Sequence, residues 1–149
     1  MSCWQIPLTV SHRNCLSSRL GTLDLFAQYA LQYLLRDQDG VESITWYKSA
    51  SKSPSARNRL RTDAYWEVMR RQMGCECFTK LQDAIVAAGF KNVNGEPDLF
   101  CWTPSRHWFF AEARRTDMPG EQQRRWFRVC RDVLGENVDI RVYHLTVRS

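Results

Sequence analysis

The chain has 149 residues, of which 44% are hydrophobic, 12% aromatic and 25% charged, a composition typical of a folded globular protein. This length fits one domain, or one domain with a short N-terminal extension. No apolar run approaches the roughly 20 residues that a membrane-spanning helix needs, and we expect no membrane partner. The sequence does not begin with a basic segment followed by an apolar one, so we predict no signal peptide. The net charge of +5 permits contact with nucleic acid or another polyanion without requiring it.

The N-terminal part of the sequence predicts one helix, one strand and a basic loop. Residues 22–36 carry apolar side chains at helical spacing, with Thr22 as a candidate N-cap. Residues 41–47 alternate and are rich in strand-forming types. Residues 48–61 are rich in serine and hold five basic residues without an acid, so we interpret them as an exposed loop. This loop is either a solvated connector or a contact for phosphates, through Lys48, Lys52, Arg57, Arg59 and Arg61.

The C-terminal part mixes helical and strand patterns. We predict helices at 62–73, 78–90 and 119–134, the last with Pro119 at its start, and strands at 97–102, 107–113 and 138–147. This order predicts an α/β fold in which a mixed β-sheet is flanked by helices. We expect residues 1–60 to form an N-terminal extension of helix, strand and basic loop, and residues 61–149 to form the core, although the sequence leaves this boundary open.

Two acids stand in apolar strand segments. Because side chains alternate along a strand, Glu112 and Arg114 should share the face opposite Ala111 and Ala113. Antiparallel pairing through a short turn would bring Asp98 close to Glu112. Two adjacent carboxylates repel unless a cation compensates them, and Mg²⁺ or Mn²⁺ does so naturally. The alternative is a surface hairpin with an ordinary Glu–Arg pair.

The surrounding residues carry a family resemblance. Gly95-Glu96-Pro97-Asp98-Leu99, then Phe110-Ala111-Glu112-Ala113-Arg114, then a polar turn with Asp117, then Gln123 and Trp126 resemble the VRR-NUC family. These are virus-type replication and repair nucleases within the PD-(D/E)xK superfamily, and the resemblance covers about residues 78–147. It implies a restriction-endonuclease-like core and hydrolysis of DNA phosphodiester bonds with Mg²⁺ or Mn²⁺. Residues before 78 match no family pattern, apart from one ligand position described below.

The resemblance assigns roles to individual residues. It implies that Asp98, Glu112 and the backbone carbonyl of Ala113 bind the metal ion. Many members add a glutamate from an upstream helix, for which Glu67 is the best candidate here; the alternative for Glu67 is a solvated helix residue. Gln123 corresponds to the family glutamine that supports the site, or else is an ordinary polar residue of a first helical turn.

The sequence departs from the family pattern at Arg114, where members carry lysine. Arginine keeps the positive charge and can donate two parallel hydrogen bonds to a phosphate, but it is not deprotonated in proteins. The following turn is one residue shorter than usual, and Arg115 replaces a glycine. The alternative to a nuclease is therefore a degenerate nuclease fold that binds nucleic acid or a partner protein.

Further arginines suggest a surface for DNA. Helical spacing places three arginines of the predicted helix 119–134 on one face. Contacts to the phosphate backbone would favour DNA structure over sequence. The expected DNA-binding residues are Arg57, Arg59, Arg115, Arg124, Arg128 and Arg131.

The expected setting is the cytoplasm, or a target cell into which the chain is delivered as part of a larger effector. Some interbacterial toxins carry such domains, which adds an inhibitory or immunity protein as an expected partner. Cys75 and Cys77 allow a weaker, third interpretation, in which a zinc ion stabilises an interaction module.

Overall fold

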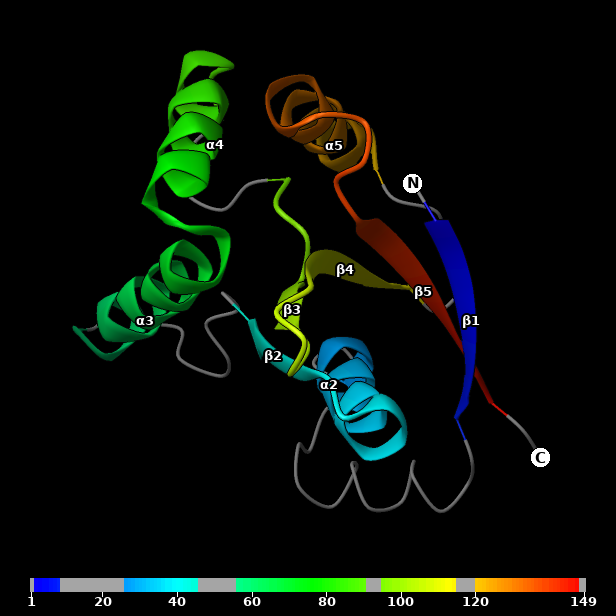
Figure 1. The fold of residues 1–149 in the computed structure, drawn as a ribbon. Coiled ribbons are helices and arrows are strands. Elements are labelled where there is room, and N and C mark those ends of the chain that lie inside the picture. Colours follow the sequence, from blue (N-terminus) through cyan, green and yellow to red (C-terminus); the bar gives the residue numbers. More distant parts are fainter. Residues whose placement is uncertain (1, 9–25, 46–55, 91–94, 115–119, 148–149) are drawn as a thin grey trace.

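The computed structural model describes residues 2–8, 26–45, 56–90, 95–114 and 120–147. Five strands form one mixed sheet in the order β1-β5-β4-β3-β2, with helices against it (Figure 1). The elements are β1 (Ser2–Leu8), α2 (Phe26–Asp39), β2 (Glu42–Thr45), α3 (Ala56–Met73), α4 (Cys75–Ala87), β3 (Leu99–Trp102), β4 (Trp108–Arg114), α5 (Glu121–Leu134) and β5 (Ile140–Val147).

The sheet combines antiparallel and parallel strand pairs. β3 and β4 form an antiparallel hairpin, and β2 pairs antiparallel with β3 after the chain has passed through α3 and α4. The chain then crosses through α5 and returns as β5, which pairs parallel with β4 on one side and with β1 on the other. The predicted α/β fold with a mixed sheet flanked by helices is confirmed at this level.

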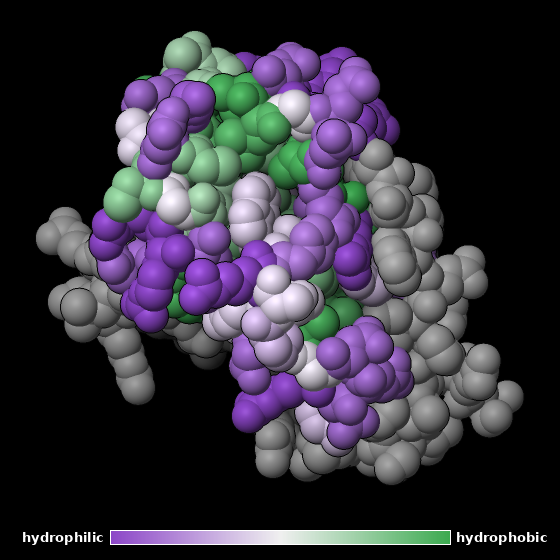
Figure 2. Space-filling view, viewed as in Figure 1, coloured by the Kyte–Doolittle hydropathy of each residue, from purple (hydrophilic) through white to green (hydrophobic). Residues whose placement is uncertain are grey.

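Helices cover both faces of the sheet, which explains why the central strands are apolar throughout. On one face, α2 packs over a cluster that includes Leu99, Cys101 and Ala111. On the other face, residues of α3, α4 and α5 pack over Phe100 and Phe110. Figure 2 shows hydrophobic residues gathered in the upper part of one side of the molecule, where α4 and α5 lie, with hydrophilic residues around them.

The helix predictions were correct in type and shifted at their ends. The predicted helix 22–36 corresponds to α2, which extends to Asp39, and the candidate cap Thr22 lies outside the described residues. α4 begins earlier than predicted, at Cys75, and α5 begins at Glu121 after the N-cap residue Gly120. None of the described helices is long and apolar enough to cross a membrane.

Two expectations for the N-terminal part require revision. The basic segment 48–61 is not entirely a loop, because α3 starts at Ala56 and includes the positions of Arg57 and Arg59. β1 was not predicted as a strand, yet it extends the sheet beyond β5. The sheet and its core thus contain elements from both sides of the expected boundary near residue 60.

Candidate active site

The β3–β4 hairpin brings the two predicted acids together. Leu99 pairs with Ala111, so continuing the register by one residue places Asp98 opposite Glu112. β4 extends past the start of β3, and the backbone N–H of Ala113 donates to Oδ2 of Asp98 at 3.0 Å. The Asp98 side chain therefore takes the place of a strand partner at this end of the hairpin.

Glu112 is the buried member of the acid pair, with a relative exposure of 1%. It lies on the face of β4 that carries Phe110, whereas Ala111 and Ala113 face α2, as strand alternation predicts. Burial raises the pKa of Glu112 well above its usual range, and the neighbouring Asp98 carboxyl raises it further.

The charge of Arg114 offsets part of this rise. Its Nη2 lies 3.4 Å from Oε1 of Glu112 and favours the ionised form of the acid. The second carboxyl oxygen, Oε2, is also buried, and no donor within the described residues bonds to it. Glu112 thus has one oxygen next to a cation and another that no donor of the described residues reaches.

Gln123 connects this group to the start of α5. Its Oε1 accepts hydrogen bonds from Nη2 of Arg114 and from the backbone N–H of Gly120, the latter at 2.8 Å. Gln123 is thus a polar residue of the first turn of α5 whose side chain also holds Arg114. The structure brings Asp98, Glu112, Arg114 and Gln123 into one connected group.

Glu67 lies elsewhere. It stands on the exposed side of α3 and forms an ion pair with Arg70, one turn along the helix, at 2.6 Å. The buried side of α3 carries Tyr65 and Met69 instead. The described part of the chain contains no group of three metal-ligating side chains, so the structure does not join Glu67 to Asp98 and Glu112.

A buried acid that the sequence did not single out is Glu96, with a relative exposure of 4%. Burial raises its pKa from 4.5 to about 8, and interaction with the Tyr65 hydroxyl offsets a small part of that rise. Burial raises the pKa of Tyr65, and the negative charges of Glu96 and Asp98 raise it further. The helix α3 therefore contributes Tyr65 to the surroundings of the site. An acid between Gly95 and Pro97 resembles a solvated loop residue, so the sequence carried no signal for its burial.

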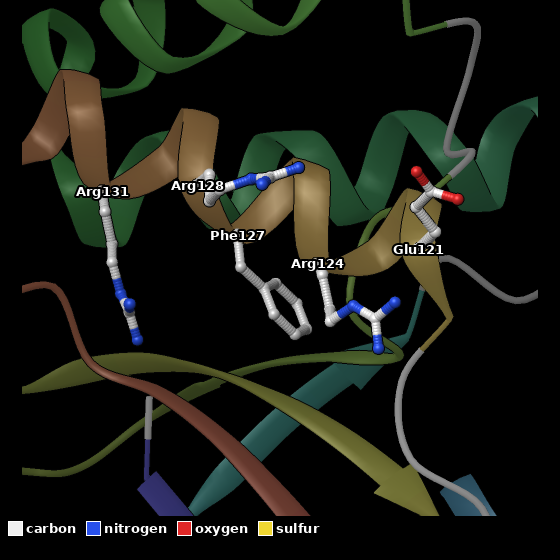
Figure 3. Close-up of a pocket in the computed structure, with 5 residues that line it drawn as sticks. All are labelled: Glu121, Arg124, Phe127, Arg128 and Arg131. Carbon is white, nitrogen blue, oxygen red and sulfur yellow. The ribbon is translucent and has the colours of Figure 1, made fainter.

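Three arginines of α5 line a pocket of about 350 Å³ together with Glu121 and Phe127. Figure 3 shows Arg124 and Arg131 directed to the same side of α5 as the Phe127 ring, with Arg128 beside them. The predicted common face of these arginines is confirmed. Arg125 has a different place, because it donates to the carbonyl of Ala88 and its guanidinium lies 4.5 Å from the centre of the Phe90 ring.

The other proposed DNA contacts are not resolved by the structure. Arg115 lies outside the described residues, and of Arg57 and Arg59 only the backbone in α3 is described. The zinc hypothesis gains no support, since Cys75 and Cys77 lie two positions apart in the first turn of α4. Helical geometry directs such residues to different sides of the helix.

The chemistry of the site is that of two hard oxygen donors beside a fixed positive charge. The chain matches no family model and no curated protein. The function must therefore be argued from the geometry of Asp98, Glu112, Arg114 and Gln123.

Proposed function

We propose that this chain is a divalent-metal-dependent nuclease that hydrolyses DNA phosphodiester bonds at the group formed by Asp98, Glu112, Arg114 and Gln123. The observation that carries the proposal is the placement of Asp98 against the buried Glu112, since the hydrogen bond from Ala113 fixes one acid beside the other. Burial of a carboxylate next to a second carboxylate is costly unless something compensates the charge. Such an arrangement is typical of a site built to hold a cation.

The residues fit Mg²⁺ or Mn²⁺. Both ions prefer carboxylate and carbonyl oxygens, and the acid pair supplies two carboxylates, one with a buried oxygen that lacks a donor among the described groups. Asp98, Glu112 and the carbonyl of Ala113 would hold the ion. When bound, such a cation supplies an activated water and neutralises charge on the phosphate.

The chain's own residues would complete the chemistry. The Arg114 guanidinium would stabilise negative charge on the phosphate oxygens, which is the electrostatic part of the work that lysine performs in the family it resembles. Gln123 would keep Arg114 in place, because its Oε1 accepts from the guanidinium while bound to the helix start. Arg114 would not act as a proton donor, since arginine stays charged.

The fold is compatible with the proposal. Along the chain, α2 and β2 are followed by α3 and α4, then by the antiparallel strands β3 and β4, the crossover helix α5 and the parallel strand β5. The acids stand on β4 and just before β3, in the middle of the sheet. A restriction-endonuclease-like core is part of what we propose.

One observation favours the second candidate, a nuclease fold that binds nucleic acid or a partner without cutting. Arg114 already lies within ion-pair distance of Glu112. A guanidinium that neutralises the acid could make a metal ion unnecessary.

Cleavage by the purified protein separates the two functions. A labelled oligonucleotide and a plasmid are incubated with the wild type and with Asp98→Asn across a titration of Mg²⁺ and Mn²⁺. The nuclease proposal requires cleavage that depends on the cation and is lost in Asp98→Asn. Intact DNA at every concentration, with DNA binding retained, would replace it with the binding function.

A further inference from the structure

The pocket beside α5 begins next to a residue of the proposed catalytic group. Gln123, which holds Arg114, is followed in the chain by Arg124, the first arginine of the pocket. From Arg124 to Arg131 the helix rises about 10 Å, at about 1.5 Å per residue. The arginines therefore form a basic path along α5 that begins one residue after Gln123.

The charge of this pocket is available to a ligand. No ion pair within the described residues engages Arg124, Arg128 or Arg131, although the exposed Glu121 lies at the pocket's edge. Arg125 differs, because its guanidinium is used for packing against α4 and Phe90. The same helix thus has one structural arginine and three that face a cavity.

The shape of the pocket limits what can enter. A volume of about 350 Å³ lies at the lower end of the range for small-ligand sites. Such a space encloses about one nucleotide unit and no double helix, and the exposed Arg124 and Arg128 leave charge accessible to the neighbouring phosphates. Phe127, whose ring lies between Arg124 and Arg131, is almost completely buried, so the accessible lining of the pocket is mainly charged (Figure 3).

We infer that the α5 pocket binds successive phosphates of a single, unpaired DNA strand and leads that strand to the Asp98–Glu112 pair. This inference rests on the proposed function and names its substrate class as single-stranded DNA or a single-stranded tail. In a double helix each strand carries a charge about every 3.4 Å along the axis, and an unpaired strand can extend further, so the path of about 10 Å spans up to about three phosphates. The contacts are to the backbone and give no base preference.

Binding is measured in EDTA with the Asp98→Asn protein, so that cleavage plays no part. A fluorescent ten-residue oligothymidine is compared with a blunt hairpin duplex of equal phosphate number. The inference predicts that the single strand binds roughly tenfold or more tightly. It also predicts that replacing Arg124, Arg128 and Arg131 with glutamine reduces the slope of log affinity against log salt by about 2, at about 0.7 per contact.

The matched control is Arg71→Gln, which removes the same charge from the exposed side of α3 and should leave binding unchanged. Far-ultraviolet circular dichroism verifies folding, and the single variant Arg128→Gln, at an exposed position, gives a second test with a slope reduced by about 0.7. Tighter binding of the duplex, or an unchanged slope in the triple variant, would overturn the inference. Competition by free thymidine monophosphate as effective as that of the oligonucleotide would also overturn it, in favour of a mononucleotide site.

These results are independent of the nuclease proposal. Single-strand binding by this pocket without metal-dependent cleavage by the wild type would contradict only the proposed reaction. Metal-dependent cleavage that does not change when the three arginines are replaced would contradict only the strand path.

Discussion

The backbone N–H of Ala113 donates a 3.0 Å hydrogen bond to Oδ2 of Asp98, and this bond attaches the segment before β3 to the end of β4. The position of one proposed metal ligand thus depends on the backbone of the strand that carries the other. Glu112 itself is buried. Substitutions can therefore test the hydrogen bond to Ala113 separately from the carboxylate charge of Asp98.

Replacement of Asp98 separates the hydrogen bond from the charge. Asp98→Asn keeps an oxygen that can accept from Ala113, so we expect a stability close to that of the wild type. Asp98→Ala leaves the N–H without this partner and should reduce the free energy of unfolding by about 1–3 kcal/mol. Both variants should lose cleavage by at least about 100-fold, because both lack the carboxylate. Urea unfolding and a cleavage assay check this, and full activity in Asp98→Asn would contradict it.

Arg114 should determine the pH dependence of cleavage. Its charge lowers the pKa of Glu112, which must be ionised to bind a cation, so the rate should rise with pH as Glu112 loses its proton. Arg114→Gln removes that charge, raises the pKa of Glu112 and should move the rising limb of the pH–rate profile to higher pH. Arg114→Lys keeps the charge and should leave the limb near its wild-type position. A limb that stays in place in Arg114→Gln would show that Glu112 does not govern it.

Glu96 should make the fold less stable as the pH rises. Its pKa is about 8 in the folded chain and 4.5 as the ordinary value, so between these pH values the folded state holds a proton that the unfolded state has released. This contribution to stability is therefore fully present below about pH 4.5 and declines towards pH 8, by on the order of 5 kcal/mol for the full pKa shift. Glu96→Gln, which cannot ionise, should remove this part of the decline.

Urea midpoints at pH 5, 7 and 9 measure the effect. Tyr65→Phe is a matched variant, because the hydroxyl lowers the pKa of Glu96 and its loss should extend the decline to higher pH. Parallel pH curves for the wild type and Glu96→Gln would show that Glu96 is not protonated in the folded protein.

Replacement of Gly95 should reduce both the stability of the fold and the rate of cleavage. The φ of Gly95 is +78°, and a Cβ at this position would lie 2.9 Å from the carbonyl oxygen of Gln122 in α5. Gly95→Ala should therefore destabilise the fold by more than the roughly 1–3 kcal/mol of backbone strain alone, and should reduce cleavage by displacing the segment that leads to Asp98.

Gly74→Ala is the control for Gly95→Ala. Gly74 also has a positive φ, +92°, but a Cβ there would meet nothing within 4 Å. Gly74→Ala should lower the free energy of unfolding only by the cost of backbone strain. Its cleavage activity should be unchanged under conditions where the protein is folded. Equal effects of the two variants on stability would mean that the contact with α5 is unimportant.

Much of the site could be predicted because it depends on local geometry. Strand alternation placed Glu112 and Arg114 on one face, and a short turn implied the pairing that brings Asp98 close. Glu67 lies on the exposed side of α3 because the rotation of that helix depends on tertiary packing, which buried Tyr65 and Met69 instead. The burial of Glu96 arises from the same packing and has no signature in the sequence.

The missed strand has a similar explanation. β1 contains Pro7 and pairs with β5, which lies more than 130 residues later in the chain. Proline is tolerated there because β1 is at the edge of the sheet. The start of α3 was missed because residues before 62 lack an apolar stripe, so their charge suggested a loop.

The most direct test of the central claim is a calorimetric titration of Mn²⁺ into the wild type, Asp98→Asn, Glu112→Gln and Glu67→Gln. Glu67→Gln is the matched control, since it removes the same charge from an exposed acid paired with Arg70. We predict a binding event in the wild type that strengthens as the pH rises, persists in Glu67→Gln and disappears in the other two variants. Absence of Mn²⁺ binding to the wild type, or binding that survives in both Asp98→Asn and Glu112→Gln, would contradict the proposed metal site.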